Sequence, residues 1–141
     1  MFSPSDLQRQ FFDLWNRRDF EKMKTLLHAD YTYTGPDGNE QTGPLAGLKA
    51  AHMWASAFPD GRIEIKNVLS QGKIAVCEFI GRGHHNGELM GVKPTGKAVE
   101  VRVVNLMEMR DGKIYREREY MDMLSVLGRL GAVTLPGSRV A

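Results

Sequence analysis

The stretch from Asp111 to Asp122 reads DGKIYREREYMD, a turn dipeptide followed by a run typical of a β-strand. Successive side chains of a strand point to opposite faces. If this run is a strand, each face therefore carries two like charges, because Arg and Glu alternate. The fold depends on which face points into the core. One face holds Tyr115, Glu117, Glu119 and Met121, and the other holds Ile114, Arg116, Arg118 and Tyr120.

The preceding run, KAVEVRVVNLMEMR at residues 97–110, is predicted to be a strand with one clearly apolar face. From Val99 onward its odd-numbered residues are apolar except for Asn105, whereas its even-numbered residues include four charged side chains. Charged residues are seldom fully buried. We therefore expect the odd face of this strand to point into the core, and the two strands to form a hairpin.

Two hairpin turns are compatible with the sequence, and they give opposite results. A two-residue loop pairs Arg110 with Lys113, whereas a three-residue loop pairs Met109 with Lys113. The first turns the arginines of the last strand inward, and the second turns its glutamates inward. Arginine stays charged and is costly to bury alone, whereas a carboxyl group can take up a proton. We therefore favour the three-residue loop.

With that loop, Glu117 and Glu119 face the core close to Asn105. Inward carboxylates can simply cap a buried backbone group or pair with an arginine from a neighbouring element. Two carboxylates on one inner face, opposite an apolar strand, favour another interpretation. Burial and mutual repulsion should raise at least one pKa toward neutrality, which suits general acid–base catalysis.

Helices are predicted before the strands. Ser3 is a candidate N-cap, Pro4 suits the first helical position and Asp6 suits the first turn. A second helix is expected after Asp19, with an apolar face that includes Leu26 and Leu27, followed by a break rich in turn residues. The remaining predicted elements are a helix over 44–58, strands over 62–69, 73–83, 97–110 and 113–123, and a short helix within 123–133 with Asp122 as its N-cap.

This order predicts an α+β fold, with helices packed on one face of a curved antiparallel sheet that can enclose a small-molecule pocket. The 141 residues suit a single domain, 1–141, and 42% apolar with 26% charged residues is ordinary for a globular protein. The net charge of +2, with no basic run, argues against nucleic acid. No segment approaches the ~20 apolar residues of a membrane helix. With one cysteine, Cys77, and no signal-like N-terminus, we expect a cytoplasmic protein.

Two motifs in the second half resemble those of SnoaL-like polyketide cyclases, also called ester cyclases. GELMGVKPTGK at residues 87–97 is followed by the DGKI turn and by a strand that ends in Asp. This combination is similar to the family pattern over an ungapped run. The positions that carry the resemblance are Gly83, His85, Gly87, Gly91, Pro94, Thr95, Gly96, Lys97, Asp111, Gly112, Lys113, Ile114, Asp122, Leu130 and Gly131.

The resemblance implies the cone-shaped, cystatin-like α+β fold shared with ketosteroid isomerase and nuclear transport factor 2, in a homodimer or homotetramer. It also implies closure of a polyketide ring by an intramolecular aldol reaction, without metal or cofactor. Family members use an Asp on the last strand as general acid/base, near a His on the preceding strand. Glu119 occupies that Asp position and Asn105 that His position.

The resulting hypothesis is a cyclase or isomerase acting on a small hydrophobic carbonyl compound. Glu119 would move a proton α to a carbonyl, Asn105 would donate a hydrogen bond to the enolate oxygen, and Glu117 would tune Glu119 or hold water. Cys77 is expected to be a buried hydrophobe and not a nucleophile. The residues expected to contact substrate are His85, for which a structural role is an equal alternative, and Phe79, Trp15, Trp54 and Tyr33.

Two other functions remain open at this point. A non-catalytic binder of small apolar molecules, or an accessory protein, could use the same scaffold, because Asn105 cannot take up a proton at neutral pH. Epoxide hydrolysis would need an arginine in the pocket, and Arg116 and Arg118 lie on the wrong face for it. The outer sheet face with Val104 and Leu106 is a candidate oligomer interface.

Overall fold

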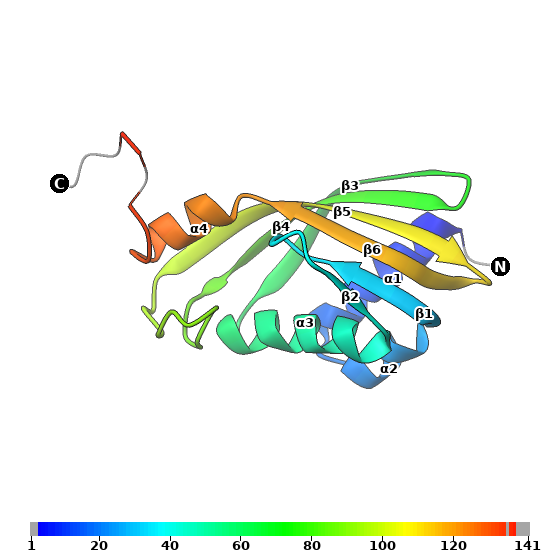
Figure 1. Cartoon of the computed structure of the whole chain (residues 1–141), viewed down its shortest axis with the longest axis horizontal. Helices are drawn as coiled ribbons and strands as arrows, with labels where there is room; N and C mark the ends of the chain where they lie inside the picture. Colours follow the sequence, from blue (N-terminus) through cyan, green and yellow to red (C-terminus); the bar gives the residue numbers. More distant parts are fainter. Residues whose placement is uncertain (1–2, 135, 138–141) are drawn as a thin grey trace.

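The computed structural model of the chain describes residues 3–134 and 136–137. Helices and strands follow one another in the predicted order, with two additional strands after the second helix (Figure 1). The helices are α1 Pro4–Asn16, α2 Phe20–Thr25, α3 Pro44–Ala57 and α4 Met123–Arg129. The strands are β1 Leu27–Thr34, β2 Glu40–Thr42, β3 Arg62–Gln71, β4 Ile74–His84, β5 Ala98–Arg110 and β6 Lys113–Met121.

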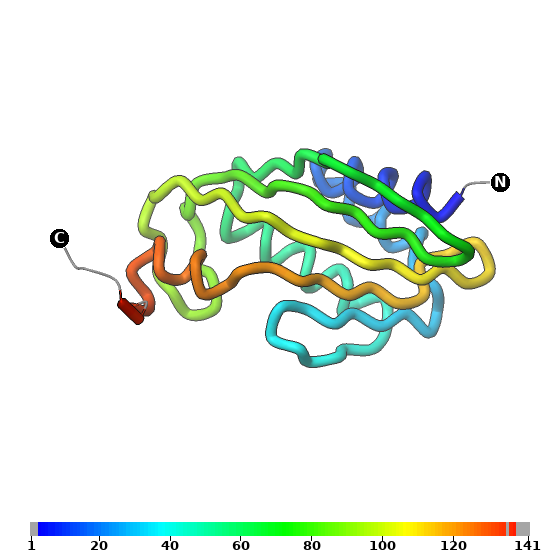
Figure 2. The backbone as a smooth tube through the Cα atoms, turned by 90° about the horizontal axis from the view of Figure 1, so that it is seen from above, coloured from blue at the N-terminus to red at the C-terminus, as the bar shows by residue number. Residues whose placement is uncertain are grey.

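The described strands form one open, curved sheet in the order β2-β1-β6-β5-β4-β3. Neighbouring strands are antiparallel except β1 and β6, which are parallel. Helices α1, α2 and α3 cover one face of the sheet and leave the other bare, as the two perpendicular views show (Figures 1 and 2). The expected α+β fold, with helices on one face of a curved sheet, is confirmed.

Local signals at the helix ends act as the sequence indicates. The Ser3 hydroxyl accepts a hydrogen bond from the Asp6 N–H, and the Asp6 carboxylate accepts one from the Ser3 N–H, so the two residues form a capping box. The Asp122 carboxylate caps α4 by accepting from the Ser125 N–H at 3.0 Å. Both predicted N-caps are therefore confirmed.

Strands β1 and β2 were not predicted. The predicted second helix extended through Leu26 and Leu27, but α2 ends at Thr25 and β1 begins at Leu27. β1 is the parallel neighbour of β6, so Tyr33 lies opposite Glu117 across the ladder. A parallel partner this distant in the sequence leaves no local turn signal. Without such a turn signal, the sequence does not indicate where β1 joins the sheet.

The turn between β5 and β6 differs from the prediction. It is a two-residue loop in which Asp111 and Gly112 both have positive φ, and Arg110 lies opposite Lys113. The predicted three-residue loop is wrong. A one-residue bulge at Tyr115 then shifts the register, because Met109 pairs with Ile114 but Glu108 pairs with Arg116.

The bulge restores the predicted side of the glutamates. Beyond it, Asn105 lies opposite Glu119 and Met107 lies opposite Glu117, and all four side chains are buried. At the start of β6, however, Ile114 is buried in place of the predicted Tyr115. Tyr115 instead packs against Arg110, whose guanidinium carbon lies 3.9 Å from the centroid of the Tyr115 ring.

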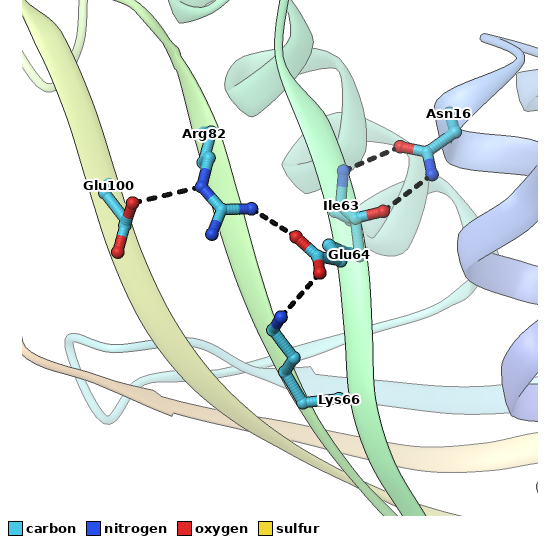
Figure 3. A network of polar contacts seen from close by, with 6 residues as sticks. All are labelled: Asn16, Ile63, Glu64, Lys66, Arg82 and Glu100. Carbon is cyan, nitrogen blue, oxygen red and sulfur yellow. Dashed lines mark hydrogen bonds and ion pairs between the residues drawn. The ribbon is translucent and has the colours of Figure 1, made fainter.

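Charged residues gather on the outer face of the sheet, as their parity predicts. Arg82 on β4 bridges Glu64 on β3 and Glu100 on β5, and Lys66 also contacts Glu64 (Figure 3). Beside them, the Asn16 side chain ties the end of α1 to the backbone N–H and C=O of Ile63. Among the residues that the structure describes, no helix combines the length and the apolar run needed to cross a bilayer.

Candidate active site

A cavity lies between the concave face of the sheet and helices α1 and α3. The empty space in and around it, including open solvent at its mouth, is about 620 Å³. The wall is mainly apolar, and its polar side chains are Trp15, Tyr33, Trp54, Glu117 and Glu119. A small neighbouring hollow shares Trp15, Trp54 and Ile63 with this wall and extends toward Val126 of α4.

Each buried glutamate accepts a hydrogen bond from a tyrosine hydroxyl on β1. Tyr31 Oη donates to Glu117 Oε1 at 2.5 Å, and Tyr33 Oη donates to Glu119 Oε1 at 2.8 Å. The geometry follows from strand pairing, because alternate residues of β1 face the same side as alternate residues of β6. The Tyr-x-Tyr spacing in HADYTYTG was the sequence signal for these partners.

Asn105 joins the two carboxyl groups from the neighbouring strand. Its Nδ2 donates to Glu117 Oε2 at 2.7 Å and to Glu119 Oε2 at 3.0 Å. Gln8 on α1 donates from Nε2 to the side-chain and backbone oxygens of Asn105, both at 3.0 Å. The amide orientation of Asn105 is thereby determined, with its oxygen toward Gln8 and both protons toward the glutamates.

This arrangement changes the role expected for Asn105. An amide nitrogen has two protons, and both are already donated to carboxyl oxygens. Asn105 is fully buried and is not on the cavity wall, so it has no donor left for an enolate oxygen. Its two hydrogen bonds join the side chains of Glu117 and Glu119.

Both buried carboxyl groups have a raised pKa. Burial, followed by the charge of Glu119, raises the pKa of Glu117 to about 8, although its hydrogen bonds from Tyr31 and Asn105 oppose the shift. Burial also raises the pKa of Glu119, against the hydrogen bonds from Tyr33 and Asn105. Each ionised carboxyl group also opposes ionisation of the other, so the buried pair keeps protons to a higher pH than exposed glutamates do.

Four of the five residues expected to contact substrate are on the cavity wall: Phe79, Trp15, Trp54 and Tyr33. His85 is not on that wall. Its ring is fully buried, and Nδ1 accepts the backbone N–H of Thr95 at 3.2 Å. His85 thus contacts the loop between β4 and β5, as the structural alternative expects.

The remaining candidates are placed as follows. Cys77 is fully buried, and burial raises the pKa of its thiol to about 11, which suits a packed hydrophobe and not a nucleophile. No arginine of the described chain lines the cavity, so the arrangement required for epoxide hydrolysis is not present there. Within residues 3–134 and 136–137, no cluster of three or more His, Cys, Asp or Glu side chains could hold a metal ion.

The sequence of the chain is similar to those of known polyketide cyclases. Residues 5–130 match the family model of the SnoaL-like polyketide cyclases. The chain is 28% identical over 113 residues to the nogalonic acid methyl ester cyclase of Streptomyces nogalater, covering 79% of this chain and 84% of that protein. It is 22% identical over 125 residues to the aklanonic acid methyl ester cyclase AcmA of Streptomyces galilaeus, covering 87% of both.

Solved structures show the same fold. AclR from Streptomyces galilaeus, a candidate hydroxylase, superposes with a TM-score of 0.82 at 26% identity, over 95% of this chain and 85% of that one. A candidate ketosteroid isomerase from Kribbella flavida superposes with a TM-score of 0.66 at 21% identity, over 84% and 77% of the two chains. The expected likeness to the ketosteroid isomerase fold is confirmed. On the evidence of the family model and these relatives, the chain belongs to the SnoaL-like polyketide cyclase family.

Proposed function

We propose that this protein is a cofactor-independent cyclase that closes a ring in a polyketide ester by an intramolecular aldol reaction. The observation that carries the proposal is the pair of buried carboxyl groups, Glu117 and Glu119, at the wall of an apolar cavity. The cyclases among the relatives are named for aklanonic and nogalonic acid methyl esters, which motivates the same substrate class here.

In the proposed reaction, ionised Glu119 takes a proton from the carbon α to a substrate carbonyl. The resulting enolate carbon attacks a second carbonyl of the same molecule, and a carbon–carbon bond forms. The acceptor oxygen becomes an alkoxide, which takes the proton held by Glu117. The pair holds one proton before the reaction, two after proton abstraction and one again at the end, so the charges balance.

The burial of two neighbouring carboxyl groups supports this assignment over a non-catalytic binder. Binding apolar molecules requires no buried carboxyl groups, and burying them costs free energy unless they are neutralised or well hydrogen-bonded. The pKa of both groups is raised, that of Glu117 to about 8, and a raised carboxyl pKa suits acid–base catalysis near neutral pH. We therefore propose Glu119 as base and Glu117 as acid, with Asn105 positioning both.

The test compares Glu119→Gln with wild type on nogalonic acid methyl ester, followed by chromatography of the ring-closed product. Exchange of the α-hydrogens of 2-tetralone in D₂O, followed by NMR, isolates the first proton transfer. We expect Glu119→Gln to lower both rates by about 10²- to 10⁴-fold, the usual contribution of a general base. The matched control is Glu78→Gln, the same change on the exposed outer face of β4.

Wild-type rates in Glu119→Gln would remove the residue from the mechanism. If the wild-type protein binds both compounds but neither closes the ring of the ester nor exchanges the hydrogens of 2-tetralone, the protein is a non-catalytic binder. The activity should also fall above about pH 8, as Glu117 loses the proton that the alkoxide needs.

We further propose that the chain self-associates through the bare face of the sheet. Exposed apolar side chains gather there from neighbouring strands, including Val104, Tyr120, Leu69 and Ile74. Light scattering coupled to gel filtration should give a dimer or tetramer, and Tyr120→Glu should shift it toward monomer. A monomeric wild-type protein at all concentrations would contradict the proposal.

A further inference from the structure

The side-chain amide of Asn105 can face the carboxyl pair in two ways. If the amide turns over, its oxygen and its NH₂ group exchange places with little change in shape. With the NH₂ group toward Glu117 and Glu119, Asn105 donates to both. With the oxygen toward them, it only accepts. The carboxyl pair is compatible with either orientation, because a carboxyl group accepts when ionised and donates when protonated.

Gln8 on α1 decides between these orientations. Its Nε2 lies 3.0 Å from the backbone oxygen of Asn105 and 3.0 Å from Asn105 Oδ1. A backbone carbonyl oxygen only accepts, so the Gln8 group that faces it is the NH₂ group. An NH₂ group only donates, so its second contact must be the side-chain oxygen of Asn105. The Asn105 nitrogen then faces Glu117 and Glu119, as observed.

Resting on the proposed function, we propose that Gln8 is a positioning residue of this site, which holds both amide protons of Asn105 on the carboxyl pair and so keeps the base ionisable. Gln8 is fully buried and is not on the cavity wall. It therefore acts through Asn105 and does not touch the substrate.

Packing alone does not account for a glutamine at this position. The Oε1 atom of Gln8 is buried and has no hydrogen-bond partner among the described residues. A buried acceptor without a partner is destabilising, and an apolar side chain of similar length would fill the same space without that cost. What the glutamine adds is its NH₂ group, and both contacts of that group are with Asn105.

The orientation of Asn105 affects how readily the carboxyl groups ionise. Burial raises the pKa of both groups, and the hydrogen bonds from Asn105 act in the opposite direction. If the amide turned over, its oxygen would accept from a protonated carboxyl group and favour that form. Loss of Gln8 should therefore raise the pKa of the pair, and less of the base would be ionised near neutral pH.

The other titratable groups around the pair leave this effect visible. Burial raises the pKa of Tyr31 and Tyr33 on β1 and of Cys77 on β4, so these groups stay neutral while the carboxyl groups titrate. Arg9 on α1 acts on Cys77 through its charge, and an arginine stays charged throughout. The remaining side chains of the cavity wall, including those of α3, do not titrate.

The first experiment needs no turnover. Gln8→Met keeps the length of the side chain and removes its amide, and ¹³C-labelled glutamate reports the titration of the carboxyl groups by NMR. We expect the pKa values of the pair to rise by about 1–2 units, the size of a hydrogen bond to a charged group. The matched control is Gln10→Met, the same change at a half-buried position of the same helix, which should leave them in place. Unchanged pKa values in Gln8→Met would overturn the proposal.

The second experiment measures α-hydrogen exchange of 2-tetralone across the pH range. In Gln8→Met we expect kcat to fall by about 3- to 30-fold at about pH 6 and to recover at higher pH, because the base ionises later. KM should change by less than about threefold, since Gln8 does not line the cavity. A loss of the same size at every pH would mean that Gln8 only supports packing, and it would overturn the proposal.

The third experiment uses wild-type protein, so it decides the question even if Gln8→Met does not fold. Both side-chain amide protons of Asn105 are donated to carboxyl oxygens, and such hydrogen bonds become stronger when the acceptor is charged. In ¹⁵N-labelled protein, both Asn105 amide proton signals should therefore move downfield as the pH rises through the titration of the pair. If neither signal moves, the orientation of Asn105 and the role of Gln8 are wrong.

The two proposals fail in different ways. If Glu119→Gln abolishes exchange while Gln8→Met keeps the wild-type pH profile, the positioning role of Gln8 is wrong and the proposed function stands. If Glu119→Gln exchanges 2-tetralone at the wild-type rate, the proposed function fails. The carboxyl titration of Gln8→Met then still decides whether Gln8 sets the ionisation of the pair.

Discussion

Raising the pH from about 5 to about 8 should destabilise this protein as its buried carboxyl groups ionise, and the contribution of Glu117 follows from its pKa. In the unfolded chain its carboxyl group ionises near its ordinary value of 4.5, whereas in the folded chain it keeps its proton up to about pH 8. Between these values the folded state binds more protons than the unfolded state. The free energy of unfolding therefore decreases as the pH rises through this window, and it is highest below pH 4.5 as far as this group is concerned.

The size of the effect follows from the two pKa values. A gap of about 3.5 pH units, at ~1.36 kcal/mol per unit, corresponds to a loss of up to about 5 kcal/mol by pH 8. Such a loss is comparable to the whole stability of many domains, about 5–15 kcal/mol. Glu117→Gln replaces the protonated carboxyl group by a neutral amide of the same shape, so it should remove most of this dependence.

Urea unfolding followed by tryptophan fluorescence, at several values between about pH 5 and about pH 8.5, measures this directly. The difference between wild type and Glu117→Gln isolates Glu117 from the other titrating groups, and Glu78→Gln serves as the exposed control. Glu119→Gln removes a neighbouring charge, so the pH dependence of Glu117 should become weaker and begin at lower pH. If wild type and Glu117→Gln lose the same free energy over this range, Glu117 is not the buried protonated group.

Two further changes test the support of the carboxyl pair. Asn105→Asp places a third carboxyl group against Glu117 and Glu119, so it should cost about 3–5 kcal/mol near neutral pH and recover in acid; a pH-independent urea midpoint equal to that of wild type would contradict this. Gly47→Ala puts a Cβ 2.7 Å from Tyr31 Cε1 and 2.9 Å from its Oη, so Tyr31 must move away from Glu117 at a cost of about 1–3 kcal/mol. An unchanged melting temperature with the Tyr31–Glu117 hydrogen bond intact in a crystal structure would show that α3 can yield instead.

Much of the fold was predictable because its signals are local. The N-caps Ser3 and Asp122 act within one helical turn, and the alternation of β5 and β6 depends only on the two-residue period of a strand. β1 was missed because its main partner in the sheet, β6, is far away in the sequence. The predicted length of the turn at Asp111 was wrong because a bulge at Tyr115, outside the turn, shifts the register of β6 and turns its glutamates inward.

The candidate site was only partly predictable for the same reason. Parity placed Glu117 and Glu119 on one side of their strand, and the lower cost of burying a charge that can be neutralised predicted that this side is buried. Hydrogen bonds depend on direction and distance, and their partners here come from α1, β1 and β5. Only the tertiary structure brings Gln8, Tyr31 and Tyr33 to this cluster, and there Asn105 donates both amide protons to the carboxyl groups and keeps none for a substrate oxygen.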